Sequence, residues 1–139
     1  VDNSNLKSQE YYINGAESIT WNSETSTATK AFATATAKAI ADVTVDDVVT
    51  RGLKYTHKEV INQQAAGLLA PTDWMVVRAA EGGTAVPSDI TTKRAAVRTK
   101  ANAMQVQIDG AADVDALAAL YVYNDATPPV RPLGEFPTL

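Results

Sequence analysis

The sequence predicts a mainly α-helical protein: a small helical domain with a short N-terminal β-hairpin and an extended, proline-rich C-terminal arm. Three observations support this class: a helical spacing of apolar residues over 90–108, an Asn-Gly pair near the start of the chain, and four prolines between residues 128 and 137. We predict an N-terminal arm and hairpin at 1–22, a helical core domain at 23–123 and an extended C-terminal arm at 124–139.

The predicted hairpin is centred on Asn14-Gly15. The flanking segments 11–13 and 18–21 are rich in aromatic and β-branched residues, which favour strands. Asn and Gly both tolerate the positive φ angles that a two-residue hairpin turn requires. The sequence therefore predicts two short strands joined at this turn.

Residues 23–41 leave two alternatives. Alanine occupies every second position from 31 to 41, and a period of two indicates a strand. Against this, alanine has a high helix propensity and is depleted from strands. Phe32, Thr36 and Ile40 are also spaced by four and would share one face of a helix. We favour the helix and keep the strand as the alternative.

A second helical segment is predicted to begin near residue 44. Thr44 and Asp47 have the spacing of a capping box in which Asp replaces Glu. Apolar residues follow at roughly helical spacing as far as Leu68, although Gly52 interrupts the pattern. Pro71 is expected to end this segment.

A short helix over residues 74–80 is predicted next, with Thr72 or Asp73 as its N-cap. The alternative for this segment is a buried strand over Met75-Val76-Val77, since short apolar runs fit either structure.

The clearest predicted helix covers residues 90–108. Pro87 can occupy its first position, and Asp109-Gly110 provides its C-terminal stop. Asp113 is then expected to cap a shorter helix, which forms an antiparallel hairpin with the first. The expected buried face of the long helix consists of Ile90, Arg94, Val97, Ala101, Met104 and Ile108.

Composition excludes several classes of function. The chain carries a net charge of −4, so we do not expect a nucleic-acid partner. It contains no cysteine, which excludes disulfides and thiolate metal sites. No apolar run approaches the roughly 18 residues of a membrane span, so we expect no membrane association. Much of the apolar fraction is alanine, which predicts a thin core.

No pattern of catalytic residues is present in the sequence. His57 is the only histidine, and we interpret it as a structural residue. No serine lies in a G-x-S-x-G turn, and the acids lack the spacing of a calcium loop. We therefore predict a non-enzymatic protein without cofactor, metal or small-molecule substrate.

Trp74, Arg94 and Arg98 are candidate protein-interaction residues. Arg94 and Arg98 are four residues apart and project from one helix face, where they can hold carboxylates. We favour pairing with acids of the same fold, such as Asp73 or Glu81. Trp74 is expected to be largely buried against the helix that carries both arginines, because the chain has few other large side chains.

The C-terminal arm contributes the remaining interaction candidates. Val130, Leu133, Phe136 and Leu139 recur every third residue, which matches the turn of a polyproline-like segment. Because proline limits conformational freedom, ordering such an arm costs little entropy. We predict that the arm docks on its own helices or on an adjacent subunit.

The segment from 68 to 98 resembles a recurrent region of bacteriophage tail-assembly chaperones and tail-fibre-assembly proteins. In that region an apolar pair precedes Thr-Asp-Trp, and a helix with an Arg-x-x-(Leu/Val)-Arg pattern follows; Lys93 replaces the usual aromatic residue before the first arginine. The matching positions here are Leu68, Leu69, Thr72, Asp73, Trp74, Arg94, Val97 and Arg98.

The resemblance implies a phage protein that works through protein–protein contacts in the tail or tail fibre. We expect it to be a minor structural component of the virion or an assembly factor, with other phage structural proteins and further copies of the chain as partners. The expected location is the virion, or the host cytoplasm during assembly. The alternatives are a tail-fibre chaperone that departs before the virion is complete and a nucleic-acid-binding accessory protein.

Overall fold

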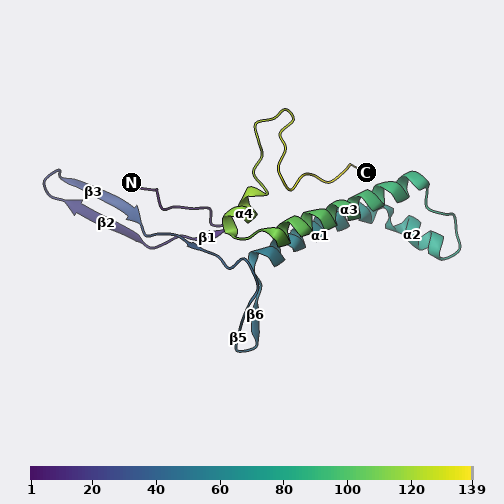
Figure 1. Ribbon diagram of the computed structural model, residues 1–139, viewed down its shortest axis with the longest axis horizontal. Coiled ribbons are helices and arrows are strands. Elements are labelled where there is room, and N and C mark those ends of the chain that lie inside the picture. The colour runs from purple at the N-terminus through teal and green to yellow at the C-terminus, as the bar shows by residue number, and fades with distance from the viewer. Residues whose placement is uncertain (139) are drawn as a thin grey trace. The chain divides into compact units, whose positions relative to one another are not determined.

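The computed structural model describes residues 1–138. They fall into two compact units, Val1–Leu53 and the described residues from Lys54 onward. In the described residues the strands all belong to the first unit and the helices to the second, apart from the first residue of α1 (Figure 1). Helix makes up 41% of the chain and strand 16%, so the prediction of a mainly α-helical fold is wrong. The division near residue 53 also differs from the boundaries at 22 and 123 that the sequence suggests.

Short strands in the first unit form three separate two-stranded antiparallel sheets. The pairs are β1 (Tyr12–Ile13) with β4 (Thr36–Ala37), β2 (Glu17–Asn22) with β3 (Thr27–Phe32), and β5 (Val43–Val45) with β6 (Val48–Thr50). The side chains of β2, β5 and β6 are exposed along their whole length. Each sheet is therefore a ribbon without a packed face of its own, and an isolated ribbon of this kind is only marginally stable in water.

Asn14-Gly15 does not form the predicted hairpin turn. β1 before it pairs with β4, and β2 after it pairs with β3, so the two expected strands belong to different sheets. Gly15 serves a close backbone approach instead: a Cβ atom there would lie 2.6 Å from the Ala33 carbonyl oxygen. The Asn-Gly pair thus connects two ribbons where the chain backbones meet.

The helix favoured for residues 23–41 is also wrong, and the strand alternative is correct for Thr27–Phe32 and Thr36–Ala37. β3 pairs with β2 over six residues, in a register that places Ala28 opposite Trp21 and Thr29 opposite Thr20. The β-branched threonines fit this pleated surface, and cross-strand contacts outweigh the helix propensity of the alanines between them. The period of two indicated the correct class of structure, but β3 begins before the alternating residues 31–41, and within them only 31–32 and 36–37 are strand.

Thr44-x-x-Asp47 is a hairpin and not the start of a helix. Asp46 and Asp47 form the two-residue connection between β5 and β6, with φ angles of 48° and 62°. Positive φ at both positions is the requirement of a type I′ turn, and Asp accepts it more readily than most residues. The expected capping box of Thr44 and Asp47 is therefore incorrect.

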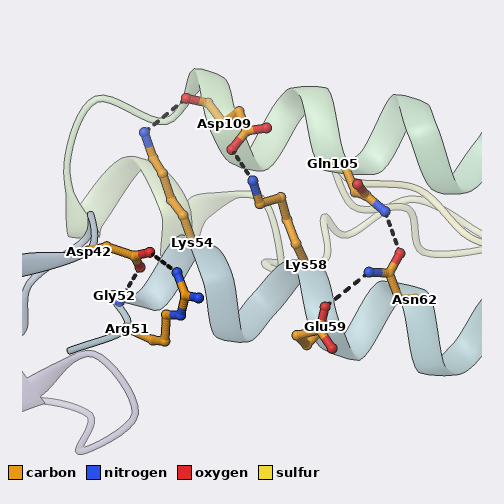
Figure 2. A network of polar contacts seen from close by, with 9 residues as sticks. All are labelled: Asp42, Arg51, Gly52, Lys54, Lys58, Glu59, Asn62, Gln105 and Asp109. Carbon is orange, nitrogen blue, oxygen red and sulfur yellow. Dashed lines mark hydrogen bonds and ion pairs between the residues drawn. The ribbon is translucent and has the colours of Figure 1, made fainter. Parts of the chain in front are cut away.

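The base of the β5–β6 hairpin is closed by the carboxylate of Asp42 (Figure 2). It accepts a hydrogen bond from Arg51 Nη1 at 2.6 Å and another from the Gly52 backbone N–H at 2.8 Å. These bonds fix the chain immediately before α1 (Leu53–Leu69), so the predicted interruption at Gly52 marks the true beginning of the helix.

The second unit continues with the predicted helices. After α1 come the 3₁₀ turn η1 (Ala70–Thr72), α2 (Asp73–Ala80), α3 (Ser88–Gly110) and α4 (Val114–Ala119). Pro71 ends α1 as predicted, and α2 is a helix and not the alternative strand. Asp113 caps α4 by accepting a hydrogen bond from the Ala116 N–H at 2.8 Å, which confirms its predicted role.

α3 runs antiparallel to α1, and polar contacts join the two helices along one side (Figure 2). Near one end, Lys58 Nζ lies 2.8 Å from Asp109 Oδ1, and Lys54 Nζ donates to the Asp109 carbonyl oxygen at 2.8 Å. Further along, Gln105 Nε2 donates to Asn62 Oδ1 at 2.6 Å. Because contacts at successive turns of α1 meet successive turns of α3, they fix the register of the pair.

The core of the second unit lies between α1, α3, α4 and the C-terminal arm. The predicted buried face of α3 is confirmed from Arg94 to Ile108, while Ile90 is only half-buried. On α1 the buried residues are His57, Ile61 and Ala65, spaced by four. The most deeply buried side chains of the unit are Ile61, Val97, Met104, Ile108, Leu117 and Leu133.

Met104→Ala is expected to lower the free energy of unfolding by about 2–5 kcal/mol, because a fully buried side chain is replaced by a cavity. Val106→Ala on the exposed side of the same helix is the matched control, with an expected change within about 0.5 kcal/mol. Urea unfolding measures both, and equal losses in the two variants would contradict this description of the core.

Candidate protein-interaction site

The corner between α1 and α2, residues 69–74, is held together by the side chain of Arg94 on α3. Arg94 Nη1 donates to the Leu69 carbonyl oxygen at 2.8 Å and to Thr72 Oγ1 at 2.6 Å. Its Nη2 donates to Asp73 Oδ1 at 2.7 Å. One planar guanidinium therefore satisfies a backbone carbonyl, a hydroxyl and a carboxylate, a set of acceptors that a lysine ammonium cannot match in geometry.

The hydroxyl of Thr72 is part of this corner and does not cap the N-terminus of α2. Its hydroxyl donates to the Leu69 carbonyl oxygen at 3.0 Å while accepting from Arg94. Thr72 occupies the N-cap position of α2 but makes no side-chain capping bond, because its hydroxyl is already engaged. The hydrogen bonds of the corner thus replace the cap that the sequence suggests.

The charge of Arg94 is almost enclosed, with 10% of its side chain exposed, whereas the Asp73 side chain is 58% exposed. A buried guanidinium is stable only with hydrogen-bonded partners, which the corner provides. The pairing of Arg94 with Asp73 inside the fold, which the sequence analysis favoured, is confirmed.

Trp74 is exposed, with 55% of its surface accessible, so the prediction that it is buried against α3 is wrong. The physical reason is the phase of α2. Asp73 must face Arg94, and the next residue of a helix points about 100° away from its predecessor. The corner therefore turns Trp74 outward.

Trp74 belongs to an apolar surface on α2 that also includes Val76 and Val77, both exposed. None of the eight residues of α2 is buried. Arg78 lies one turn after Trp74, and its Cζ is 4.8 Å from the centroid of the indole ring, within cation–π range. Arg78 Nε is buried and has no hydrogen-bond partner among residues 1–138.

A cavity of about 210 Å³ lies beside this surface. Its lining consists of Val76, Val86, Thr91, Arg94 and Arg98. The two predicted arginines therefore line the same cavity but differ in role. Arg94 is buried and holds the corner, whereas Arg98 is exposed and has no ion pair with another described residue.

The C-terminal arm docks on the helices of its own unit, one of the two outcomes that the sequence analysis left open. Leu133 is fully buried, its N–H donates to the Leu120 carbonyl oxygen at 3.0 Å, and its carbonyl oxygen accepts from Lys100 Nζ at 2.8 Å. Phe136 is half-buried beside a cavity of about 390 Å³ that Gly67 and Leu68 also line.

The other candidates on the arm differ from Leu133 in their exposure. Val130 remains exposed and is still open to a partner. Leu133 is fully buried in its own unit and is therefore not available to a partner. Leu139, the last of the four apolar positions, lies outside the described residues.

Glu135 fixes the arm through a small polar cluster. Its carboxylate accepts from the Tyr123 hydroxyl at 2.5 Å and lies 2.8 Å from Arg131 Nε. The Tyr123 hydrogen bond, followed by the charge of Arg131, lowers the pKa of Glu135 below its ordinary value of 4.5. The same hydrogen bond raises the pKa of Tyr123, because it stabilises the protonated phenol.

His57 occupies a structural position in the second unit. It is buried, and its Nδ1 lies 2.8 Å from the Tyr121 hydroxyl oxygen. Across residues 1–138, no group of three or more His, Cys, Asp or Glu side chains is arranged to hold a metal ion. In the same residues no helix combines the length and apolar character needed to cross a membrane.

The contact of Arg78 with Trp74 and the presence of Val86 in the cavity wall were not predicted. Arg78 stands four positions after Trp74 on a helix, and this spacing was a usable signal for its contact with the indole ring. Val86 lies in the connection between α2 and α3, where no periodicity identifies the residues that face a cavity.

No protein-family model matches the chain, and no curated protein or solved structure matches it significantly.

Arg94→Ala is expected to lower the free energy of unfolding by about 1.5–3 kcal/mol, because it removes charge-assisted hydrogen bonds and leaves the corner unsatisfied. Arg94→Lys should recover only part of this loss, since an ammonium lacks the planar fork. Arg98→Ala is the control, with an expected change within about 0.5 kcal/mol. Urea unfolding of the three variants decides, and equal losses for Arg94→Ala and Arg98→Ala would refute the role of the corner.

The lowered pKa of Glu135 makes docking of the arm depend on pH. The ionised carboxylate stabilises the docked arm above its ordinary pKa of 4.5, and this stabilisation is lost as the pH falls through the lowered folded pKa. We expect the melting temperature of the wild type to fall more steeply with acidification than that of Glu135→Gln. Melting curves between about pH 7 and about pH 3 measure the difference; parallel pH profiles would show that the cluster does not fix the arm.

Proposed function

We propose that the chain is a non-enzymatic bacteriophage protein that acts through protein–protein contacts in the tail or tail fibre, as a minor structural component of the virion or an assembly factor. The observation that carries the proposal is the Arg94-held corner that presents Trp74 to solvent. The phage setting itself rests on the resemblance of the Thr72-Asp73-Trp74 and Arg94-x-x-Val97-Arg98 segments.

The corner has the features of a binding site and not of a core. A chain with only two tryptophans and a thin core would gain stability by burying Trp74. In this fold the buried Arg94 side chain instead holds Asp73, and Trp74 stays exposed. Tryptophan and arginine are the side chains that most often carry the binding energy of protein interfaces. Trp74 with Arg78 stacked on it, next to Val77, supplies this combination on one short helix.

The fixed position of the indole also supports binding. Three hydrogen bonds from Arg94 immobilise residues 69–73. The backbone that carries the exposed indole ring of Trp74 is therefore ordered. An anchor that is already ordered loses little conformational entropy when a partner covers it. The surface is therefore suited to recognition of another protein.

Trp74→Ala is expected to change the free energy of unfolding by less than about 1 kcal/mol, because the side chain is exposed, while strongly reducing incorporation of the chain into phage particles. Quantitative mass spectrometry of purified particles measures the copies per particle for the wild type, Trp74→Ala and the control Val106→Ala.

Two results would count against the proposal as stated. Absence of the wild-type chain from purified particles would identify a departing chaperone and not a virion component. Normal incorporation of Trp74→Ala would show that the exposed indole is not the contact.

A further inference from the structure

The tip of the β5–β6 hairpin presents two carboxylates between exposed valines. Asp46 and Asp47 are exposed and make no ion pair with another residue of the described chain. Val45 and Val48, which flank them and lie opposite each other, have 63% and 67% of their surface exposed. The tip is therefore both acidic and apolar.

The residues of this turn are not those that folding alone would favour. A type I′ turn with φ angles of 48° and 62° is best formed by Asn-Gly or Asp-Gly, because glycine has no Cβ to strain. Here both positions carry a side chain, and the two side chains repel each other electrostatically. The hairpin keeps two negative charges at a cost to its own stability, which points to a use for them outside the hairpin.

A surface of complementary character lies in the second unit. The cavity of about 210 Å³ is lined by the apolar residues Val76 and Val86, by Thr91, and by Arg94 and Arg98. Arg94 is engaged by Asp73, whereas Arg98 has no carboxylate partner among residues 1–138. The cavity thus offers one uncompensated positive charge next to an apolar wall.

We propose that the β5–β6 tip of a second copy of the chain occupies this cavity. The Asp46 and Asp47 carboxylates of that copy pair with Arg98, and its flanking valines pack on the aliphatic wall. Charge complementarity and the matching apolar neighbours select this occupant. The inference rests on the proposed function insofar as it treats residues 69–98 as a protein-binding surface.

The contact joins two different surfaces of the chain and is therefore heterologous. A copy that donates its tip still has an empty cavity. A copy that receives a tip in its cavity still has its own tip free. Such contacts repeat until they close into a ring, or they continue as a filament. The expected product is a head-to-tail series of copies.

Sedimentation of the full-length chain over about 5 to 500 µM tests the contact. We expect the wild type to associate with increasing concentration, and less at high salt because the pairing charges are screened. The double variant D46N/D47G keeps or improves the turn but removes both carboxylates, and it should weaken association about tenfold or more. R98E should weaken association to a similar extent, whereas K93E, a charge reversal on the same helix outside the cavity, should associate like the wild type.

A mixture of D46N/D47G with R98E makes the test directional. The intact tip of R98E can enter the intact cavity of D46N/D47G, and the pair has no further complementary surfaces, so the mixture should form dimers and stop there. The proposal is overturned by a wild type that stays monomeric, by D46N/D47G or R98E associating like the wild type, or by a mixture that stays monomeric or grows beyond dimers. These outcomes are independent of incorporation into particles, which tests the proposed function separately.

Discussion

The buried guanidinium of Arg94 is the interaction on which the arrangement of the second unit's candidate site depends. It reaches from α3 to three acceptors around the end of α1, where Pro71 stops the helix, and so fixes how α2 leaves this point. Without those acceptors the cation could not be buried, and without the cation the Leu69 carbonyl and the Asp73 carboxylate would lose their common donor. The Arg94 side chain sets the direction in which Trp74 points. It also forms part of the wall of the cavity that Arg98 lines.

The Arg94 corner also gives a physical meaning to the spacing of the sequence motif. The apolar pair at 68–69 ends a helix, the threonine and aspartate supply the acceptors, and the tryptophan is the first residue that can point away from them. An arginine about twenty residues later can return to this point because α3 runs antiparallel to α1. The residues of the motif therefore belong to one hydrogen-bonded corner and do not act as independent positions.

The second unit was largely predictable and the first was not, for reasons that lie in the strength of the local signals. α3 repeats its apolar residues over five turns and α4 has a capping aspartate, so periodicity and local hydrogen bonding agree. In the first unit the strands have only two to six residues, and β1 pairs with β4 across the intervening β2–β3 hairpin, a separation that no local pattern encodes. Arg94, Arg98 and Leu133 were identifiable by residue type, but the exposure of Trp74 depended on the phase of α2, which only the corner determines.

The separation of the first unit into three ribbons has a consequence for how the protein loses its structure. Ribbons that share no strand and bury few side chains have little reason to melt together, because cooperativity arises from a common core. The helices of the second unit, by contrast, meet around Met104, Ile108 and Leu117 and gain or lose these contacts jointly. Backbone amides in the ribbons therefore exchange with solvent through local opening at low free energy, while those of α1 and α3 exchange only when the whole unit opens.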